Sequence, residues 1–450
     1  MSFNTISVIG LGYIGLPTAA MFASKGMKVI GVDVSQHIVD IINAGKVHIV
    51  EPELEIMVKK VVYEGMLKAT ISLQAADAFL IAVPTPFLSG NTKKSIPEPD
   101  LSYVKAAVKS VAKVLKKGDL VILESTSPVG ATEQMSTWLE ELRTDLTFPQ
   151  THGEDSDIRV AYCPERVLPG HVVRELVEND RIIGGMTNRC SKAAIELYKI
   201  FVLGDCVVTN SRTAEMAKLT ENSSRDVSIA FANELSIICD SLDIDVWELI
   251  NLANRHPRVN ILQPGPGVGG HCIAVDPWFI VSSAPEQAQL IRAAREVNDS
   301  KPHWVVDKVL AALGGYLIKN SGKTVSDVTI ACFGLSFKAD IDDLRESPAL
   351  LIVERLLKET SCRILVVEPN INNLPDSLRG AELASSIEAA SQQCDIALLL
   401  VDHQEFKSDL RLLLSNCSVV DTCGILNCTR SVSHAPSVGG LRKPPDLTSL

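Results

Sequence analysis

The sequence predicts an α/β protein with two Rossmann-like doubly wound domains joined by a central all-helical domain. Three observations support this prediction. Short apolar runs alternate with amphipathic helical stretches in the N-terminal half, the same alternation returns near residue 328, and helical patterning dominates the section between them. Parallel strands need crossover connections, so strands that alternate with helices indicate parallel, doubly wound sheets.

Composition is typical of a globular protein and excludes several other classes. The 450 residues are enough for two to four domains with substantial cores. A net charge of −11 argues against a nucleic-acid partner, which would favour a basic surface. No apolar run approaches the ~18 residues of a membrane span, so we expect no membrane partner.

The cysteines and the start of the chain bear on the cellular compartment. The eleven cysteines are odd in number and scattered without CxxC spacing. Only about five residues precede the first strand-like run, without the basic region of a secretion signal. We therefore expect a cytoplasmic protein with reduced thiols, most of them small buried apolar side chains.

The first domain is expected over residues 1–209. Its strand candidates are ISVIG (6–10), KVIGVDV (28–34), AFLIAV (78–83), DLVILES (119–125) and VAYCPE (160–165). Each is a short apolar run, and amphipathic stretches separate them, so the sheet should be mostly parallel. Polar segments at 88–100 and 152–157 are expected to be surface loops.

The central domain is expected over residues 210–315. A stretch from 212 to 242 contains neither proline nor glycine and is compatible with one long helix. Two further stretches, 246–256 and 287–299, also favour helix, so this section should be all-α.

The third domain is expected over residues 316–430. Its strand candidates are VTIACFGL, RILVVEPN, DIALLLVD and CSVVDTCG, and ESPALLIVERLLKE is a helix candidate. As in the first domain, a glycine-containing turn follows the first strand candidate, and the second strand candidate ends in an acidic residue. The tail 431–450 is rich in serine, proline and glycine, and we expect it to be poorly ordered.

The turn after the first strand candidate predicts a dinucleotide site. Gly10, Gly12 and Gly15 form G-x-G-x-x-G between a strand and a helix, and Asp33 ends the next strand candidate. Such glycines permit a tight turn and let a pyrophosphate approach the helix N-terminus. Asp33 would accept hydrogen bonds from ribose hydroxyls and disfavour a 2′-phosphate, which predicts NAD rather than NADP. A purely structural turn is the alternative.

Four further positions are candidate cofactor contacts. Tyr13 and Ile14 lie within the glycine turn, where backbone N–H groups would face the ligand. Thr85 in VPTP and Thr126 in ESTSPVG follow the third and fourth strand candidates, at the edge where such sheets bind ligands. For each threonine, a plain turn is the alternative.

Three polar residues in the long helical stretch, Lys218, Asn222 and Arg225, are spaced i, i+4 and i+7. On a helix this spacing places them on one face. Lys218 would polarise a reacting oxygen or hold an alkoxide, and Asn222 would position a water or hydroxyl. A solvated helix surface is the alternative interpretation.

Cys272 lies in the stretch GPGVGGHCIAVDPW and allows three interpretations. A metal site is disfavoured, because His271 is the only neighbour at ligand spacing. A small buried apolar residue is the common role of a cysteine. The glycines before the thiol and Asp276 after it favour the third role, a partly exposed nucleophile.

A thiol nucleophile together with NAD narrows the chemistry. A thiolate that adds to an aldehyde forms a thiohemiacetal, which becomes a thioester when it gives up a hydride. Water then releases an acid, and Glu165 in YCPERVLPG, at the end of a strand candidate, could direct that water. The combination predicts two successive oxidations, of which the second requires Cys272.

Six motifs, in this order, resemble the UDP-glucose/GDP-mannose 6-dehydrogenase family over about residues 1–428: VIGLGYIGLP, ESTSPVG, YCPER, AEMAKLTEN, GVGGHCIAVDP and FGLSFKADIDDLRESP. The segment NLANRHPRVNILQPGPGVGGHCIAVDPWFIV is similar to the branch that acts on UDP-N-acetylhexosamines. The resemblance implies an NAD domain, a central dimerisation domain and a C-terminal UDP-binding domain. It also implies a homodimer that oxidises C6 of UDP-N-acetyl-D-mannosamine with two NAD per sugar, for bacterial surface polysaccharide of the enterobacterial common antigen type.

The resemblance also implies roles for individual residues. Cys272 matches the nucleophile, Lys218 the acid/base or oxyanion-holding lysine, and Glu165 the glutamate of thioester hydrolysis. Asn222 and Asp276 match residues that assist through a shared water. Substrate contacts are implied for Arg166, Val167, Lys218, Asn222, Arg225, Gly269 and Lys338.

Four residues in two further segments are also assigned by this resemblance. Lys338 and Arg345, in FGLSFKADIDDLRESP, match positions that close on the sugar nucleotide and the cofactor. His256 and Arg258 resemble the segment that lies at the active site of the partner subunit. A solvated helix end is the alternative for these two.

Other functions stay open on the sequence alone. The same chemistry on UDP-N-acetylglucosamine, UDP-N-acetylgalactosamine or UDP-glucose is one alternative. The shape of the binding pocket selects the sugar, and the sequence does not give that shape. A single-oxidation alcohol dehydrogenase is disfavoured by Cys272 and Glu165. A nucleotide-sugar-binding regulator is the non-enzyme alternative, disfavoured because Lys218 and Cys272 are both present. We expect no metal.

Overall fold

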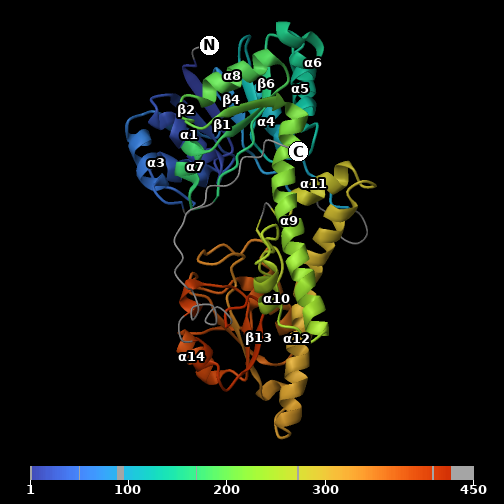
Figure 1. Cartoon of the computed structure of the whole chain (residues 1–450). Helices are drawn as coiled ribbons and strands as arrows, with labels where there is room; N and C mark the ends of the chain where they lie inside the picture. The colour runs from blue at the N-terminus through green and yellow to red at the C-terminus, as the bar shows by residue number, and fades with distance from the viewer. Residues whose placement is uncertain are drawn as a thin grey trace, which may run out of the picture. The chain divides into compact units, whose positions relative to one another are not determined.

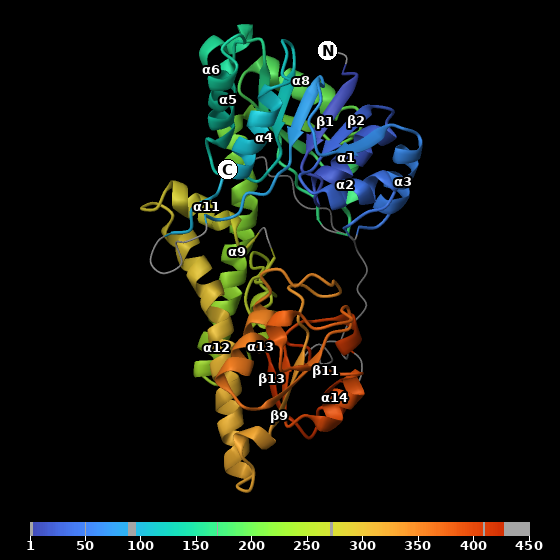
Figure 2. The same ribbon diagram turned by 180° about the vertical axis from the view of Figure 1, so that it is seen from behind.

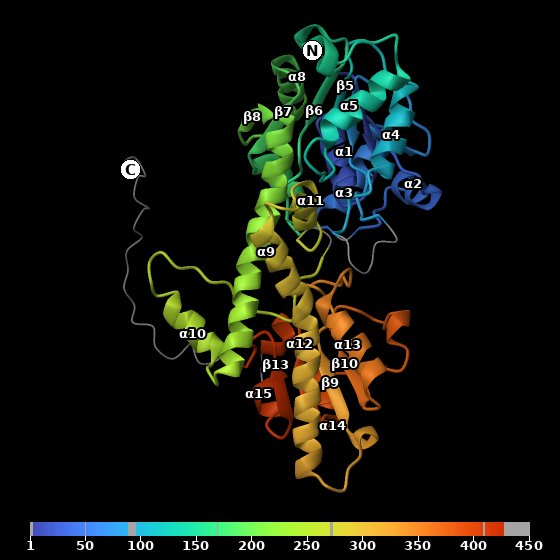
Figure 3. The same ribbon diagram turned by 90° about the vertical axis from the view of Figure 1, so that its right-hand side faces the viewer.

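The computed structural model describes residues 3–49, 51–88, 96–168, 170–270, 273–407 and 410–426. These residues form two compact units, each with its own sheet (Figures 1, 2 and 3). The first unit contains the chain up to Val227 and a later segment that ends at Arg295. The second contains the segments that begin at Ser228 and at Glu296. No helix in the described ranges is long and apolar enough to cross a membrane.

The first unit is built on an eight-stranded sheet with the order β3-β2-β1-β4-β5-β6-β7-β8. Neighbouring strands run parallel except β6 and β7. The strands are β1 (Thr5–Ile9), β2 (Lys28–Val32), β3 (Leu67–Thr70), β4 (Ala78–Ile81), β5 (Leu120–Leu123), β6 (Arg159–Tyr162), β7 (Arg181–Gly185) and β8 (Cys206–Asn210).

This sheet confirms the predicted doubly wound fold, and the five strand candidates match β1, β2, β4, β5 and β6. Strands β3, β7 and β8 have no counterpart among the strand candidates. The segment LKAT is short, RIIGG ends in two glycines, and CVVTN is largely exposed, so none of them reads as a buried apolar run.

Helices cover both faces of the first sheet, because its strand residues alternate between two hydrophobic clusters. In β4, Ala78 and Leu80 belong to one cluster, and Phe79 and Ile81 belong to the other. The helices are α1 (Gly15–Ser24), α2 (Gln36–Asn43), α3 (Leu54–Tyr63), α4 (Ser102–Ala112), α5 (Ala131–Leu142), α6 (Pro149–His152), α7 (Val172–Glu178) and α8 (Asn188–Tyr198). A short 3-10 helix, Gly153–Asp155, lies where the sequence predicted only a loop.

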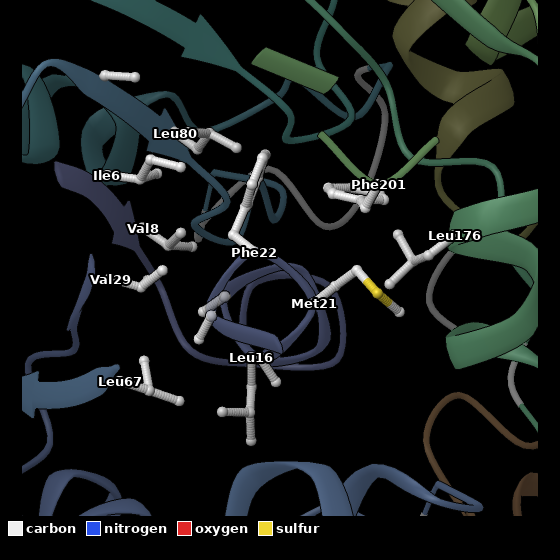
Figure 4. Packing of buried hydrophobic residues seen from close by; sticks show 14 of the residues in the cluster. Ile6, Val8, Leu16, Met21, Phe22, Val29, Leu67, Leu80, Leu176 and Phe201 are labelled. Carbon is white, nitrogen blue, oxygen red and sulfur yellow. The ribbon is translucent and has the colours of Figure 1, made fainter. Parts of the chain in front are cut away.

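Helix α1 is the centre of one cluster, with nine of its ten residues buried. Figure 4 shows Leu16 and Phe22 of this helix among the apolar side chains of the strands. The ring of Phe22 packs edge-on against Phe201, with centroids 4.8 Å apart. Burying one such aromatic side chain contributes about 1.5–3 kcal/mol, so this packing fixes the helix that follows the glycine turn.

The central helical section is confirmed. Helices α9 (Ser211–Ser241) and α12 (Gln289–Lys319) contribute to both units, while α10 (Val246–Ala253) and α11 (Asp276–Ser283) are short. Helix α12 continues well past the predicted end at residue 299 and contains Pro302. A proline inside a helix lacks the N–H of the helical hydrogen bond, which is why the sequence suggested an earlier end.

The second unit is built on a five-stranded parallel sheet with the order β11-β10-β9-β12-β13. Its strands are β9 (Thr329–Phe333), β10 (Arg363–Val367), β11 (Glu382–Leu383), β12 (Ile396–Leu399) and β13 (Ser418–Asp421). Its helices are α13 (Pro348–Glu359), α14 (Ile387–Gln393) and α15 (Leu410–Leu413), with short 3-10 helices at Val325–Asp327, Asp376–Leu378 and Gln404–Lys407. The four strand candidates of this region match β9, β10, β12 and β13.

The second sheet repeats the glycine turn of the first. Gly10 follows β1 with a φ of 92°, and Gly334 follows β9 with a φ of 97°. The N–H of Gly10 donates to the carbonyl of Val32 over 2.8 Å, and the N–H of Gly334 donates to that of Val367 over 2.8 Å. The similarity between the two halves of the sequence therefore reflects two copies of one local structure.

Each copy also ends its second strand in an acid, but the two acids have different surroundings. Glu368, after β10, is 5% exposed and accepts hydrogen bonds from the backbone N–H groups of Leu335 and Ser336. His403 Nδ1 accepts from the N–H of Asp340, so the proton is on Nε2, which donates to Glu368 over 3.0 Å. This second acid is fully satisfied within the protein.

Candidate active site

Two of the three motif glycines are required by the turn itself. A Cβ on Gly10 would lie 2.5 Å from the carbonyl oxygen of Ala82, and a Cβ on Gly15 would lie 1.8 Å from that of Gly10. Gly12 differs, because a Cβ there would meet nothing within 4 Å. Open space at Gly12 is what a ligand needs to approach the N-terminus of α1, and Ile14 at the N-cap makes no side-chain cap. The turn therefore fits a pyrophosphate.

Asp33 is positioned across this turn. Its Oδ2 accepts the N–H of Leu11 over 3.0 Å, and its Oδ1 accepts the N–H of Ser35 over 3.0 Å. The side chain is half-buried, and a carboxylate has about four lone-pair sites, so acceptor capacity is left for ribose hydroxyls. This geometry fits the adenosine part of NAD.

The two predicted threonines lie at the carboxyl ends of neighbouring strands. The Thr85 hydroxyl donates to the carbonyl of Thr126 over 2.6 Å, and Thr85 is 8% exposed. The hydroxyl of Ser125 donates to the carbonyl of Val83 over 2.7 Å. These hydrogen bonds connect the loop after β4 with the loop after β5, so the side chain of Thr85 has a structural role. Thr126 is the more exposed of the two threonines.

Glu215, which was not among the predicted site residues, connects helix α9 to the segment after β5. Glu215 is fully buried and accepts the N–H groups of Gly130 and Thr132 over 2.6 and 2.8 Å, and the hydroxyl of Thr132 over 2.6 Å. These donors lie at the N-terminus of α5, whose unpaired N–H groups favour a carboxylate. The segment EMAKLTEN contains several polar residues, and nothing in the sequence indicates that Glu215 is the buried one.

Asn222 and Asp276, predicted to act together, are brought into contact. The amide of Asn222 donates to Asp276 Oδ2 over 2.5 Å, and α11 lies beside α9 in all three ribbon views (Figures 1, 2 and 3). Asp276 is 3% exposed. Burial raises its pKa to about 6, although the Asn222 hydrogen bond and the charge of Lys218 act in the opposite direction. The group can therefore take up or release a proton near neutral pH.

Lys218 lies one turn before Asn222 on the same helix and is half-buried. Its charge is close enough to affect the pKa of Asp276, so three predicted residues form one polar cluster. Arg225, the third member of the predicted helix face, is exposed.

Glu165, after β6, is 7% exposed and held by two donors. Its Oε1 accepts the N–H of Arg166 over 2.7 Å, and its Oε2 accepts Nη2 of Arg181 over 2.5 Å. Arg166 pairs with Glu221 of α9 over 2.6 Å, and Val167 is half-buried against the core. Arg181 was not predicted, because its partner Glu165 is near it only through the pairing of β6 with β7.

In the second unit, the glycine loop packs on the segment that contains Lys338 and Arg345. A Cβ on Gly269 would lie 2.5 Å from the carbonyl oxygen of Glu346 and 2.7 Å from Cβ of Phe337. The N–H of Gly270 donates to the carbonyl of Arg345 over 3.2 Å. Lys338 is exposed, and the guanidinium of Arg345 pairs with Asp343 over 2.6 Å. Glycine is therefore required where this loop meets the predicted substrate-binding segment.

The remaining predicted residues are either exposed or outside the residues that the structure describes. His256 and Arg258 are exposed after α10. Cys272 and its neighbour His271 lie outside the described residues, so the role of the thiol stays a prediction. The segment after residue 426, which includes the predicted tail, also lies outside them.

Comparisons with known proteins identify the family. Three family models of the UDP-glucose/GDP-mannose dehydrogenases match the chain: the NAD-binding domain over residues 4–202, the central domain over 212–300 and the UDP-binding domain over 331–428. The chain belongs to the UDP-glucose/GDP-mannose dehydrogenase family. It is therefore an NAD-dependent oxidoreductase that acts on a UDP-sugar, and the resemblance seen in the sequence is confirmed.

Similar proteins extend over nearly the whole chain of this dehydrogenase. UDP-N-acetyl-D-mannosamine dehydrogenase of Salmonella typhimurium is 64% identical over 94% of this chain and 100% of its own length. NDP-N-acetyl-D-galactosaminuronic acid dehydrogenase of Ralstonia nicotianae is 61% identical over 96% of this chain and 98% of its own length. The solved structure of UDP-D-ManNAc dehydrogenase from Pyrococcus horikoshii is 40% identical, covers 94% of this chain and 96% of its own, and superposes with a TM-score of 0.82. The regulator alternative is thus excluded.

Proposed function

We propose that this dehydrogenase oxidises C6 of UDP-N-acetyl-D-mannosamine to the uronic acid in two steps, with two NAD per sugar. The observation that supports it most is the hydrogen bond between Asn222 and the buried Asp276, within reach of the charge of Lys218. The sugar follows from relatives of 63–64% identity that are named UDP-N-acetyl-D-mannosamine dehydrogenases. An N-acetylgalactosamine sugar is the second candidate, because a relative of 61% identity carries that name.

The first oxidation converts the C6 alcohol to an aldehyde. We assign Asp276 to accept the hydroxyl proton through a water that Asn222 positions, and Lys218 to stabilise the developing alkoxide. Bound NAD supplies a hydride acceptor, held by the turn that contains Gly12 and by Asp33. A carboxyl whose pKa is about 6 suits this role, because it is ionised at neutral pH and still basic enough to take a proton.

The second oxidation converts the aldehyde to an acid through Cys272. Its thiolate adds to the aldehyde carbon and forms a thiohemiacetal, whose alkoxide Lys218 stabilises. Loss of a hydride from that carbon, for which a second NAD would supply the acceptor, leaves a thioester. A water directed by Glu165 then attacks the thioester, which releases the uronic acid and returns the thiol.

The sugar nucleotide itself would be held by residues from separated segments. Arginine and lysine suit the anionic diphosphate, and arginine can bond two of its oxygens at once. We assign this binding to Arg166, Val167, Arg225, Gly269 and Lys338, with Arg345 near the cofactor. We further propose a cytoplasmic homodimer in which His256 and Arg258 reach the active site of the partner subunit, and a product used for surface polysaccharide. The three-domain division at residues 209, 315 and 430 belongs to the same proposal.

The test is the yield of NADH per sugar consumed, with UDP-N-acetylmannosamine, UDP-N-acetylglucosamine, UDP-N-acetylgalactosamine and UDP-glucose in parallel. We expect two NADH per sugar and the fastest turnover with the manno epimer. Two NADH with another sugar favoured would keep the mechanism and reject the substrate. One NADH per sugar, or acid formation by Cys272→Ser, would reject the thioester mechanism.

A further inference from the structure

We infer that Arg181 is a positioning residue for the hydrolytic step, which fixes the carboxylate of Glu165 while Glu124 and Tyr198 fix Arg181. The inference rests on the proposed function, because it assigns Arg181 through the role of Glu165. It adds three buried residues to the enzyme that the motif comparison did not single out. All four lie in the first unit.

Sheet topology brings these residues to one edge. Glu124 directly follows β5 and Glu165 follows β6, so both lie at the carboxyl ends of strands, where ligands bind in doubly wound sheets. Arg181 begins β7, which pairs antiparallel with β6 in the register Ala161 to Gly185. The first residue of β7 therefore lies near the carboxyl end of β6, where Nη2 of Arg181 donates to Glu165. Reversal of one strand therefore delivers a guanidinium to the ligand-binding edge.

The Glu165 carboxylate is held in one orientation. Its hydrogen bonds to the described residues are those to the N–H of Arg166 and to Nη2 of Arg181, one on each oxygen. The backbone donor is part of the same chain segment, so Arg181 alone connects the carboxylate to the sheet. A carboxylate that directs a water must present a defined lone pair, which depends on such a fixed orientation.

Arg181 is in turn fixed from two other sides. It is 4% exposed, its Nη1 lies 3.7 Å from Oε1 of Glu124, and its guanidinium carbon lies 4.2 Å from the ring centroid of Tyr198. The Tyr198 hydroxyl donates to the same Oε1 of Glu124 over 2.5 Å. Cation–π contact and a buried carboxyl group together leave the guanidinium little freedom.

Stability alone does not account for this cluster. A buried ion pair is often no more stabilising than apolar residues of the same volume, because desolvation offsets the attraction. Within the described residues, Arg181 Nη1 and Glu124 Oε2 make no hydrogen bond, although both are buried. Burial raises the pKa of Glu124 to about 7 despite the charge of Arg181, so this acid is poorly accommodated as an anion. Such costs are expected where side chains are held for function.

The test compares Arg181→Met and Arg181→Lys with matched variants of another buried arginine. Arg159 begins β6, is 2% exposed and donates to the carbonyls of Ser156 and Asp157, without contact to Glu165. Folding of each variant is checked by its thermal transition. Stopped-flow NADH formation with the UDP-sugar and NAD then separates the two oxidations from hydrolysis, and intact mass detects an acyl adduct on Cys272.

We expect Arg181→Met to show a burst of two NADH per active site, an accumulated adduct, and a steady-state rate lowered about 10- to 100-fold, the effect of losing one hydrogen bond to a charged group. Arg181→Lys should partly restore the rate, and Arg159→Met should give no adduct. If Arg181→Met does not fold, Tyr198→Phe provides the second variant, since it removes only the hydroxyl bond. We expect a smaller accumulation of adduct in Tyr198→Phe.

Two results would overturn the inference. Loss of rate in the Arg181 variants without any adduct would mean a structural role only, as would equal behaviour of the Arg159 variants. Glu165→Gln tests the proposed function separately. An adduct in Glu165→Gln but not in the Arg181 variants would reject only the role of Arg181. A yield of one NADH per sugar in the wild-type enzyme would reject the proposed two-step oxidation itself.

Discussion

We expect Asp276→Asn to inactivate the dehydrogenase and, at alkaline pH, to stabilise its first unit. Asp276 is 3% exposed, and burial raises its pKa from 3.8 to about 6. An ionised carboxylate is therefore unfavourable in the fold at the pH where catalysis needs it. Asparagine keeps an oxygen that can accept from Asn222 but cannot ionise.

The magnitude follows from linkage between protonation and folding. Because the pKa of Asp276 is higher in the folded state, the contribution of this carboxyl to stability is fully present below the unfolded pKa of 3.8. That contribution is lost as pH rises through about 6. A difference of about 2 pKa units corresponds to about 3 kcal/mol, which is the upper limit of the loss. We expect the variant to gain about 1–3 kcal/mol over the wild type at pH 8, and little at pH 4.

Urea unfolding of the wild type and the variant at pH 4 and pH 8 measures this difference in the free energy of unfolding. The unfolding is monitored by tryptophan fluorescence, to which Trp278 in α11 contributes. Comparison at equal pH cancels the titration of all other groups. Asp77→Asn is the control of opposite sign: burial acts to raise the pKa of Asp77, but hydrogen bonds from the backbone of Asn4 and Thr5 and from Lys116 outweigh it and lower the pKa. That variant should lose stability at pH 8. An Asp276→Asn protein less stable than the wild type at pH 8 would refute the reasoning.

Four further variants test the cofactor turn and the polar cluster. Gly12→Ala should fold normally but bind NAD weakly in a calorimetric titration, because its Cβ meets only the space for the ligand. Gly15→Ala should lower the melting temperature as well, because its Cβ would meet the carbonyl of Gly10; equal melting temperatures for the two variants would contradict this. Lys218→Ala should lower kcat about 10²- to 10⁴-fold, with an unchanged rate refuting its role. Asp33→Ala should weaken NAD binding, and unchanged affinity would place the ribose contact elsewhere.

Much of the fold was predictable because the deciding signals are local. Five strands of the first sheet are apolar runs, and the long helix α9 contains no residue that would interrupt it. The elements that were missed lack such signals. Strand β8 is largely exposed at the edge of its sheet, and α12 continues through Pro302, where tertiary packing overrides local preference.

The candidate site divides in the same way. Helical spacing was sufficient to place Lys218 and Asn222 on one face of a helix. The spacing of the glycine motif was sufficient to predict that Gly12 lies in the turn after the first strand and Asp33 at the end of the next. The role of Arg181 could not be found from spacing, because its contact with Glu165 depends on one reversed strand. Contacts of this kind become visible only when the strand order is known.

The presence of two glycine turns raises the question whether each of them can bind a nucleotide in the way expected for NAD at the first turn. Both halves have the same glycine turn and an acid after the second strand, Asp33 in one half and Glu368 in the other. In one half the acid is half-buried with lone pairs to spare. In the other half, His403, the side-chain amide of Asn370 and three backbone N–H groups donate to the acid. A ribose would have to displace an internal hydrogen-bond network to bind there. Duplication of a framework thus need not duplicate its ligand, because side chains such as His403 and Asn370 can occupy the position that a ribose would need in the second copy.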